Sequence, residues 1–241
     1  MLRVEDISKR FEKVIALDKV SFTAKIGEVL GIIGPNGSGK TTLIRIISAL
    51  LKPDEGRVFF DDINVQTNHL EAKGFLSYVP ELPMLLANLT VEEHIDFVAR
   101  VNLVKGYKAQ ADELIKRFDL EDKRKSDVGT LSKGQGQKVN IISALIKKPR
   151  LLLFDEPLIG VDPKAALNLR KLIREHAASG AVVIISSHQL PVVEDVADRI
   201  LFLQKGKVAA SGTLDELKAS LGAGRDAKLE DLYMAMAEDA E

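Results

Sequence analysis

EVLGIIGPNGSGKTTLIRIISALL, residues 28–51, contains in one run the three pieces that decide the fold. Its first part is a short, continuous apolar segment, which is typical of a parallel strand covered on both faces. A glycine-rich turn follows, and the residues from Thr41 to Leu51 predict a helix. A buried strand, a tight turn and a helix in this order form a unit of α/β folds.

Two further segments repeat the strand pattern later in the chain. RLLLFDE, residues 150–156, and AVVIISS, residues 181–187, are also short apolar runs. Helices are predicted at 162–178, where Pro163 suits the first turn, and at 191–198. Strands alternating with helices predict a doubly wound α/β core with a mostly parallel sheet.

The rest of the chain has different periodicities. LRVEDI and VSFTAKI near the start alternate apolar and polar residues, which predicts a small antiparallel β layer. RILFLQ and KVAASG predict two short strands, LGAGRDAK a flexible joint and LEDLYMAMAEDAE a short amphipathic helix. We expect one domain, residues 1–241, with an α/β core and β layer (1–79 and 149–220), an inserted helical subdomain (80–148) and a C-terminal tail helix (221–241).

Charge and composition exclude several kinds of partner and site. The net charge of −1 leaves no basic surface of the kind that binds nucleic acid, so we expect no nucleic-acid partner. The absence of cysteine excludes disulfides, thiolate metal sites and a catalytic thiol. MLRVEDISKR has no apolar core segment and does not resemble a secretory signal. The longest apolar stretches are far shorter than the roughly 20 residues that cross a bilayer, so we expect any membrane span to belong to another chain.

The turn in the opening stretch carries a phosphate-binding pattern. GPNGSGKT, residues 34–41, matches G-x-x-x-x-G-K-[ST] between a predicted strand and a predicted helix, which is the context that the motif requires. Glycines let backbone N–H groups converge on phosphates, the lysine neutralises β/γ oxygens, and the last hydroxyl binds Mg²⁺. The candidate nucleotide-binding residues are Gly34, Pro35, Asn36, Gly37, Ser38, Gly39, Lys40, Thr41 and Thr42.

Two adjacent carboxylates end the most apolar predicted strand, LLLFDE. Asp155 suits a metal role, through water, and Glu156 can point the other way and polarise an attacking water molecule. Carboxylates at a strand end can also be plain surface residues. Their place behind LLLF, in the same predicted sheet as the phosphate loop, favours the catalytic interpretation.

A second anion-binding pattern, LSKGQGQKVN, lies at residues 131–140, before a helical run. LSKGQ resembles the LSGGQ signature of ATP-binding cassette (ABC) ATPases. GPNGSGKT, LLLFDEP, GVDP and SSH occur in that family's order, and the resemblance covers nearly the whole chain. It is closest in kind to the ATPase subunits of ABC transporters of the exporter type, and it implies a P-loop NTPase fold that uses ATP and Mg²⁺.

The resemblance also implies partners. Two such ATPases face each other head to tail, so Ser132, Gly134 and Gln135 would contact the γ-phosphate held by the other subunit's phosphate loop. We therefore expect a second ABC ATPase subunit, with a homodimer favoured, and one or more multi-spanning membrane subunits. The expected location is cytoplasmic, peripheral on the inner face of the cell membrane.

Other roles follow from the resemblance one residue at a time. Phe11 matches the aromatic residue that stacks on adenine, although a core position is the alternative. Asp162 matches the loop residue that links the two sites of a dimer, and it also suits a helix N-cap. His188 matches the switch histidine that contacts the γ-phosphate. Three other histidines, which are expected at the surface, are His69, His94 and His176.

Besides Lys133 in LSKGQ, two positions depart from the family pattern. Glu81 in YVPELP stands where glutamine is usual; we expect it to approach Mg²⁺ and the attacking water, with an added negative charge. Gly136 replaces a long side chain, and glycine early in a helix costs up to about 1 kcal/mol relative to alanine, so that first turn is expected to be loose. The expected catalytic residues are thus Glu156, His188 and Glu81, and the expected metal ligands are Thr41, Asp155 and Glu81.

Met84, Leu85 and Leu86 leave two interpretations open. In transporters of the family this region receives a short helix of the membrane subunit, and the alternative is that these residues belong to the subdomain core. We expect the chain to be the ATPase subunit of a transporter, energising movement through separate membrane subunits. The alternative is a soluble ABC ATPase that drives assembly or remodelling of a macromolecular complex, and a P-loop kinase would leave LSKGQ and SSH without roles.

Overall fold

The opening stretch forms strand β3 (Val29–Ile33), a tight turn and helix α1 (Lys40–Ile47) in the computed structural model. The helix ends at Ile47 rather than at the expected Leu51. Ala49 has a φ of 58°, and the amide of Leu51 turns back to donate to the carbonyl of Arg45 at 3.0 Å. A left-handed residue followed by such a bond is a common way to end a helix.

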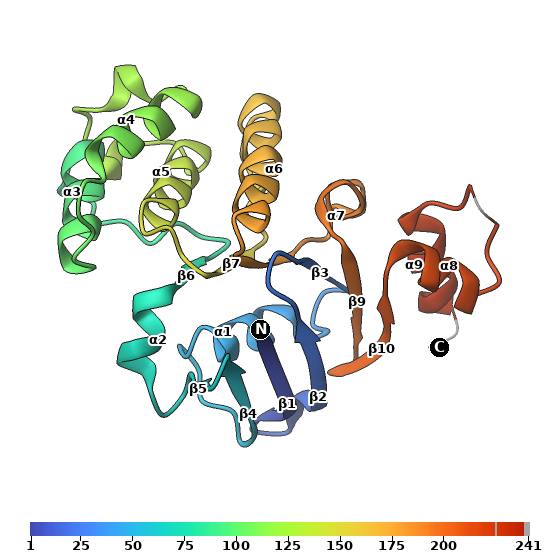
Figure 1. Cartoon of the computed structure of the whole chain (residues 1–241). Coiled ribbons are helices and arrows are strands. Elements are labelled where there is room, and N and C mark those ends of the chain that lie inside the picture. The colour runs from blue at the N-terminus through green and yellow to red at the C-terminus, as the bar shows by residue number, and fades with distance from the viewer. Residues whose placement is uncertain (225, 239–241) are drawn as a thin grey trace.

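Strand β3 is an inner strand of a six-stranded sheet of order β10-β9-β3-β8-β7-β6 (Figure 1). The neighbouring pairs from β9 to β6 are parallel, and β10 pairs antiparallel with β9. The mostly parallel sheet predicted from the sequence is confirmed. Its other strands are β6 (Leu76–Val79), β7 (Leu151–Asp155), β8 (Val182–Ser186), β9 (Arg199–Gln204) and β10 (Lys207–Gly212).

Side chains of the parallel strands alternate between two hydrophobic cores. In β7, Leu151 and Leu153 enter one core, and Leu152 and Phe154 enter the other. All four are fully buried. Successive side chains of a strand point to opposite faces, so a strand covered on both faces has a continuous apolar run.

The first core lies between the parallel sheet, helix α1 and an antiparallel sheet of order β2-β1-β4-β5. Leu2 and Val20 of the antiparallel sheet and Leu43 of α1 are buried in it. Phe60 stacks on Phe75 with ring centroids 4.8 Å apart. The small antiparallel layer is confirmed, with elements between 55 and 75 that the sequence did not predict. The elements are β1 (Leu2–Phe11), β2 (Val14–Ala24), β4 (Glu55–Phe60), β5 (Ile63–Asn64) and α2 (His69–Phe75).

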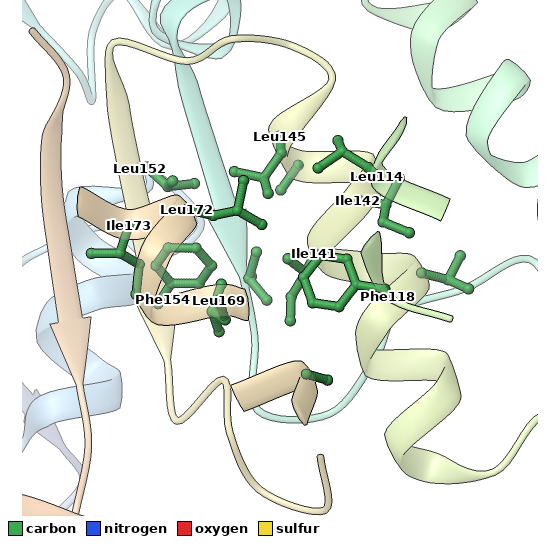
Figure 2. Packing of buried hydrophobic residues seen from close by; sticks show 14 of the residues in the cluster. Leu114, Phe118, Ile141, Ile142, Leu145, Leu152, Phe154, Leu169, Leu172 and Ile173 are labelled. Carbon is green, nitrogen blue, oxygen red and sulfur yellow. The ribbon is translucent and has the colours of Figure 1, made fainter. Parts of the chain in front are cut away.

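The second core joins the parallel sheet to the predicted helical insertion. Phe154 of the sheet and Leu172, Ile141 and Phe118 of the helices belong to one continuous cluster (Figure 2). Between residues 91 and 145 the chain forms helices, and their buried residues share this one cluster with the sheet. These helices, with the helix that follows β7, are α3 (Val91–Val101), α4 (Lys108–Arg117), α5 (Lys133–Leu145) and α6 (Pro163–Ala178), and two 3₁₀ turns lie at Glu121–Lys123 and Val128–Thr130.

A third, smaller core holds the C-terminal helices against β9. Phe202 of β9 stacks on Tyr233 with ring centroids 6.1 Å apart, and Leu217 and Leu229 are buried beside them. The helix expected at 191–198 ends at Val196 because Ala197 is already extended. The three helices are α7 (Leu190–Val196), α8 (Leu214–Ser220) and α9 (Leu229–Glu238).

The structure describes residues 1–224 and 226–238. The predicted joint at 221–228 includes residue 225, and the predicted tail at 221–241 includes residues 239–241; these positions lie outside the described residues. Among the helices of the described residues, none has both the length and the apolar character that spanning a bilayer requires.

Candidate active site

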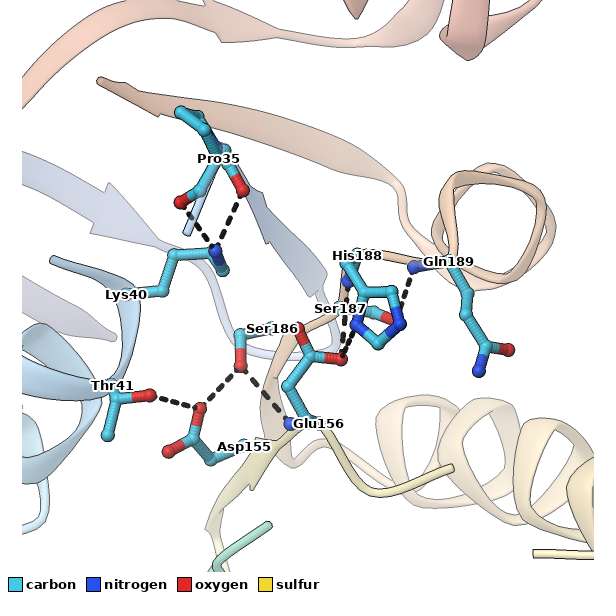
Figure 3. Close-up of polar contacts among 10 residues, drawn as sticks. Pro35, Lys40, Thr41, Asp155, Glu156, Ser186, Ser187, His188 and Gln189 are labelled. Carbon is cyan, nitrogen blue, oxygen red and sulfur yellow. Dashed lines mark hydrogen bonds and ion pairs between the residues drawn. The ribbon is translucent and has the colours of Figure 1, made fainter. Parts of the chain in front are cut away.

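The carboxyl edge of the parallel sheet brings together the residues that the sequence singled out for chemistry. The phosphate loop (residues 34–41) follows β3, Asp155 ends β7 with Glu156 next to it, and His188 follows β8. Glu81 lies in the loop after β6. Figure 3 shows the loop, both carboxylates and the histidine at this edge. Ligands of open α/β sheets bind at this edge.

The phosphate loop is packed too closely for larger residues at two of its glycines. A Cβ on Gly39, whose φ is 106°, would lie 2.5 Å from the carbonyl oxygen of Ala16, and one on Gly34 would lie 2.0 Å from that of Leu203. The Ser38 hydroxyl is buried in this loop and has no hydrogen-bond partner among the described residues. Such a cradle fits an anion that supplies acceptor oxygens. Pro35, Asn36 and Gly37 are exposed at the crest of the loop, and Thr41 and Thr42 are half-buried in the first turn of α1.

Lys40 turns back onto its own loop. Its Nζ donates to the carbonyl oxygens of Gly34 at 2.7 Å and Pro35 at 3.1 Å (Figure 3). Burial lowers the pKa of Lys40, while the nearby carboxylates of Glu156 and Asp155 act in the opposite direction. Carbonyl oxygens are weaker partners for an ammonium group than phosphate oxygens, so a bound phosphate would compete well for this side chain.

Asp155 is fixed by hydroxyl groups on both carboxylate oxygens. Its Oδ1 accepts from Thr41 Oγ1 at 3.1 Å and from Ser186 Oγ at 2.8 Å, and its Oδ2 accepts from the Tyr78 phenol at 3.4 Å. Burial, followed by the charge of Asp155, raises the pKa of Tyr78 to about 12, so the phenol keeps its proton. The sequence interpretation missed Tyr78 and Ser186. The available signal was their place at the ends of strands that neighbour β7.

The chemistry of this group fits Mg²⁺. Thr41 and Asp155 present oxygen donors, which Mg²⁺ prefers, and no three His, Asp or Glu side chains gather into a metal cage within residues 1–224 and 226–238. Mg²⁺ commonly binds one or two protein oxygens together with water and phosphate oxygens. Thr41 and Asp155 would therefore hold it jointly with a nucleotide.

Glu81 lies apart from this pair. It is exposed and, among the described residues, makes no hydrogen bond or ion pair. Its loop is fastened by Gln137 of α5, which donates to the Pro80 carbonyl at 3.0 Å. The base of the Glu81 loop is thus tied to α5, a connection that the sequence interpretation missed.

Glu156 faces away from Asp155, as expected, and contacts His188. Glu156 Oε2 lies 2.9 Å from His188 Nδ1 and accepts the His188 backbone N–H at 3.2 Å (Figure 3). The pairing requires the proton on Nδ1, a tautomer inferred from the contact. Glu156 itself has a φ of 49°, and its N–H donates to the Ser186 carbonyl at 3.1 Å. Left-handed backbone at a non-glycine residue is uncommon and concentrates at functional sites.

Phe11 ends β1 at the tip of the first hairpin and is 46% exposed. The core alternative for this side chain is therefore wrong. Lys9 Nζ lies 5.6 Å from the ring centroid on the same strand. The ring is exposed to solvent, as stacking on a base requires.

The signature loop (residues 131–135) begins α5 with a capping box. Ser132 Oγ accepts the Gln135 amide at 3.2 Å, and Gln135 Oε1 accepts the Ser132 amide at 3.0 Å. The capping box closes this first turn, and a Cβ on Gly136 would come within 3.3 Å of Leu85 Cδ1; the expected looseness of the turn stays a prediction. No hydrogen bond or ion pair joins the signature loop to the phosphate loop in the described part of the chain.

Asp162 caps helix α6 and pairs with a lysine. Its Oδ1 accepts the Ala165 amide at 2.9 Å, and its Oδ2 lies 2.6 Å from Lys138 Nζ. The hydrogen bond from Lys138 and then that from Ala165 lower the pKa of Asp162. The N-cap predicted from the sequence is present, and the lysine partner was not foreseen.

The expectation of a surface position is wrong for one histidine. His94 of α3 is 4% exposed, and its Nδ1 accepts the Leu86 amide at 3.4 Å. His69 is exposed and His176 is half-buried. The apolar side of α3 turns His94 inward, onto the loop that precedes the helix.

Comparisons with known proteins agree on one family. The ABC transporter family model matches residues 17–159. The "ABC-type transporter ATP-binding protein EcsA" of Bacillus subtilis (strain 168) is 35% identical over 247 residues, which cover 99% of this chain and 97% of that protein. A solved structure of an ATP binding subunit of an ABC transporter has a TM-score of 0.93 at 33% identity and covers 98% of this chain and 99% of that one. A dimeric ATP-binding cassette in a post-hydrolysis state, bound to ADP and Pi, has a TM-score of 0.78 at 28% identity, covering 89% and 99%.

Proposed function

The chain belongs to the ATP-binding subunits of ABC transporters and is an ATPase, and we propose that two copies of it close around ATP at sites that each copy completes for the other. Each site would take its phosphate loop and carboxylates from one copy and its signature loop from the other. The main support for this active site is that two carboxylates adjacent in the chain point in different directions. Asp155 faces the Thr41 hydroxyl, and Glu156 faces His188.

The phosphate loop binds the β- and γ-phosphates in this proposal. Lys40 exchanges its bonds to the loop carbonyls for phosphate oxygens, and the buried Ser38 hydroxyl gains an acceptor. Thr41 and Asp155 hold Mg²⁺, which would neutralise charge on the phosphates when bound. Phe11 presents its exposed ring to adenine. Glu81 is close enough in sequence to the end of β6 to reach the metal or the attacking water after a loop movement.

Glu156 is the proposed general base. Its carboxylate accepts a proton from water at the oxygen that now faces His188, and the histidine holds this side chain by two contacts, through its ring and its backbone N–H. Because Glu156 is only 9% exposed, little bulk water surrounds the carboxylate. In the closed dimer His188 would also contact the γ-phosphate.

The signature loop supports sharing between copies. Ser132 is exposed at the N-terminus of α5, and the capping box holds that helix end in place without help from another chain. A helix N-terminus favours negative charge. Ser132, Gly134 and Gln135 are therefore proposed to contact the γ-phosphate bound by the other copy, and Asp162 is proposed to lie at the boundary of the two sites.

We also propose that the chain is divided into a core (1–79 and 149–220), a helical part (80–148) and a tail (221–241). Its proposed partners are membrane subunits. Met84 is 75% exposed and Leu86 is 45% exposed, whereas Leu85 packs against the core. Two exposed apolar side chains, on either side of Leu85, favour a docking surface here. The chain would lie on the inner face of the cell membrane, and the family resemblance of YVPELP favours export as the direction.

A soluble remodelling ATPase is the alternative. The two functions differ in one observable, because the transporter subunit would co-purify from membranes in mild detergent with a multi-spanning protein and the remodelling ATPase would not. The exposed apolar residues Met84 and Leu86 favour the transporter.

A substitution at the proposed general base tests the mechanism. Glu156→Gln should bind ATP and accumulate a closed dimer, because it keeps the shape of the side chain and removes the proton acceptor. Gel filtration with light scattering should show a dimer with ATP and a monomer without it, and turnover should fall by about 10²-fold or more. Glu71→Gln on α2, an exposed position, is the matched control and should behave as the wild type. Normal turnover of Glu156→Gln would contradict the assignment.

A further inference from the structure

Helix α5 carries a buried lysine, Lys138, that has no role in the proposed active site. Lys138 is 7% exposed, and its Nζ lies 2.6 Å from Asp162 Oδ2. Taking an ammonium group out of water is unfavourable unless a carboxylate or similar acceptor compensates it. The arrangement therefore ties the helix that begins with the signature loop to the loop that leads into α6.

A second contact joins the same two segments through the backbone. A Cβ on Gly134 of the signature loop would lie 2.2 Å from the carbonyl oxygen of Gly160. Gly160 has a φ of 76°, and Lys133 passes over it, since a Cβ there would lie 3.8 Å from Lys133 Cδ. The 160–162 loop is thus in van der Waals contact with the signature loop at Gly160, and Asp162 is joined by an ion pair to Lys138, further along α5.

Asp162 has little freedom to leave this arrangement. One carboxylate oxygen caps α6 through the Ala165 amide at 2.9 Å, and the other is the partner of Lys138. Helix α6 packs its buried face, including Leu169 and Leu172, into the large core. The orientation of the 160–162 loop is therefore set by α6 and by α5 together.

We propose that Lys138 is a positioning residue that locks the signature loop and the 160–162 loop into one rigid surface, and that a second copy of this chain docks on that surface in the closed, ATP-bound dimer. This inference rests on the proposed function, because it assumes that the signature loop meets ATP held by the other copy. Lys138 itself is too buried to contact that ATP. Its contribution is to hold both loops in the one arrangement that fits the partner.

A positioning role differs from a purely structural one in what it affects. The phosphate loop, Asp155 and Glu156 make no hydrogen bond or ion pair with Lys138 or Asp162 in the described part of the chain, so ATP binding by a single copy should not depend on the pair. Closure of the dimer should depend on it. A tie that only stabilises the fold would change the melting temperature without a selective effect on closure.

The test uses the full chain in the Glu156→Gln background. Lys138→Met removes the charge and keeps most of the length, Lys138→Arg keeps the charge, and Asp162→Asn removes the partner's charge but keeps a residue that caps helices well. The dimer dissociation constant is measured with ATP by analytical ultracentrifugation, and ATP binding to dilute monomer is measured with a fluorescent ATP analogue. Lys207→Met, which breaks an exposed ion pair with Asp18, is the matched control.

The proposal expects Lys138→Met and Asp162→Asn each to raise the dimer dissociation constant by about tenfold or more, with monomer affinity for the analogue within about twofold of the parent. Lys138→Arg should restore most of the dimer, and Lys207→Met should not change it. If Lys138→Met and Asp162→Asn dimerise as the parent does, the positioning role of Lys138 is overturned and the proposed function still stands. If Glu156→Gln itself stays monomeric with ATP, the proposed function fails and this inference with it. Should Lys138→Met not fold, Lys138→Gln, which also removes the charge, decides.

Discussion

Asp155 and Glu156 are adjacent in the chain, yet their carboxylates have different neighbours. Asp155 accepts hydrogen bonds from Thr41, Ser186 and Tyr78, whereas Glu156 contacts His188. Hydroxyl donors fix the orientation of a carboxylate, as a metal ligand requires. A carboxylate paired with an imidazole can instead exchange a proton. The two proposed roles thus rest on different neighbours, which come from α1, β6, β8 and the loop that follows β8.

Ser186 gives the sharpest test at the residue scale. Its side chain is fully buried and donates to Asp155, and Ser186→Ala removes this donor. The substitution should lower the free energy of unfolding by about 1 kcal/mol and the turnover by roughly tenfold. Ser77→Ala is the matched control, because the Ser77 hydroxyl is also buried and donates to the Ala144 carbonyl at 3.0 Å. Chemical denaturation and steady-state ATPase assays measure both effects. Equal losses of turnover in the two variants would show that Ser186 has no special role.

Helix α3 holds the loop that carries the exposed Met84 and Leu86. Its N-terminus has a capping box in which Thr90 Oγ1 accepts the Glu93 amide at 3.2 Å and Glu93 Oε2 accepts the Thr90 amide at 2.9 Å. One turn further, His94 accepts the Leu86 amide. A helix end with satisfied backbone groups and a buried side chain under the loop gives the exposed residues a defined base.

His94 should make this helix sensitive to acid. Burial lowers the pKa of His94 below its ordinary value of about 6.5, so below that pH the unfolded chain binds a proton before the folded chain does. The folded state therefore loses stability as the pH falls from about 6.5 through the pKa of His94 in the folded chain. Above pH 6.5 His94 causes no such loss. His94→Asn keeps an acceptor for the Leu86 amide without this titration. Urea unfolding at pH 7.5 and pH 5.5 should show a smaller loss in the variant, and an equal loss in both proteins would refute this role for His94.

At the scale of the whole molecule, the phosphate loop and the signature loop are held by different contacts. The phosphate loop lies between β3 and α1, whereas the signature loop contacts Gly160 and its helix α5 pairs with Asp162 through Lys138. The core that runs from Phe154 to Phe118 connects the two parts through packed side chains (Figure 2). A close-packed core transmits small displacements. Ligand binding at one loop is therefore expected to displace the other loop slightly.

Mixing two inactive variants tests whether two copies share each site. In a dimer of Lys40→Ala and Ser132→Arg chains, both lesions fall in one site and the other site is intact. An equal mixture should recover up to about a quarter of wild-type ATPase activity, since half of the dimers are mixed and one site in each of these is whole.

The control mixes Lys40→Ala with Asp155→Asn chains. Both of these lesions lie in the half of the site that belongs to a single copy, so every site in a mixed dimer keeps one lesion and no activity should return. If the first mixture stays inactive although mixed dimers have formed, the sites are not shared between copies.

The motifs and several local elements could be predicted from the sequence. Apolar runs predicted β3, β7 and β8, the spacing of glycines predicted the phosphate loop, and Asp162 before Pro163 predicted the cap of α6. Each of these features depends on residues close together in the chain. The tertiary structure alone decided which distant residues meet. It placed Tyr78 and Ser186 on Asp155, buried His94, and paired Lys138 with Asp162. These contacts depend on strand order and helix packing, which bring together side chains far apart in sequence, and no local pattern contains that information.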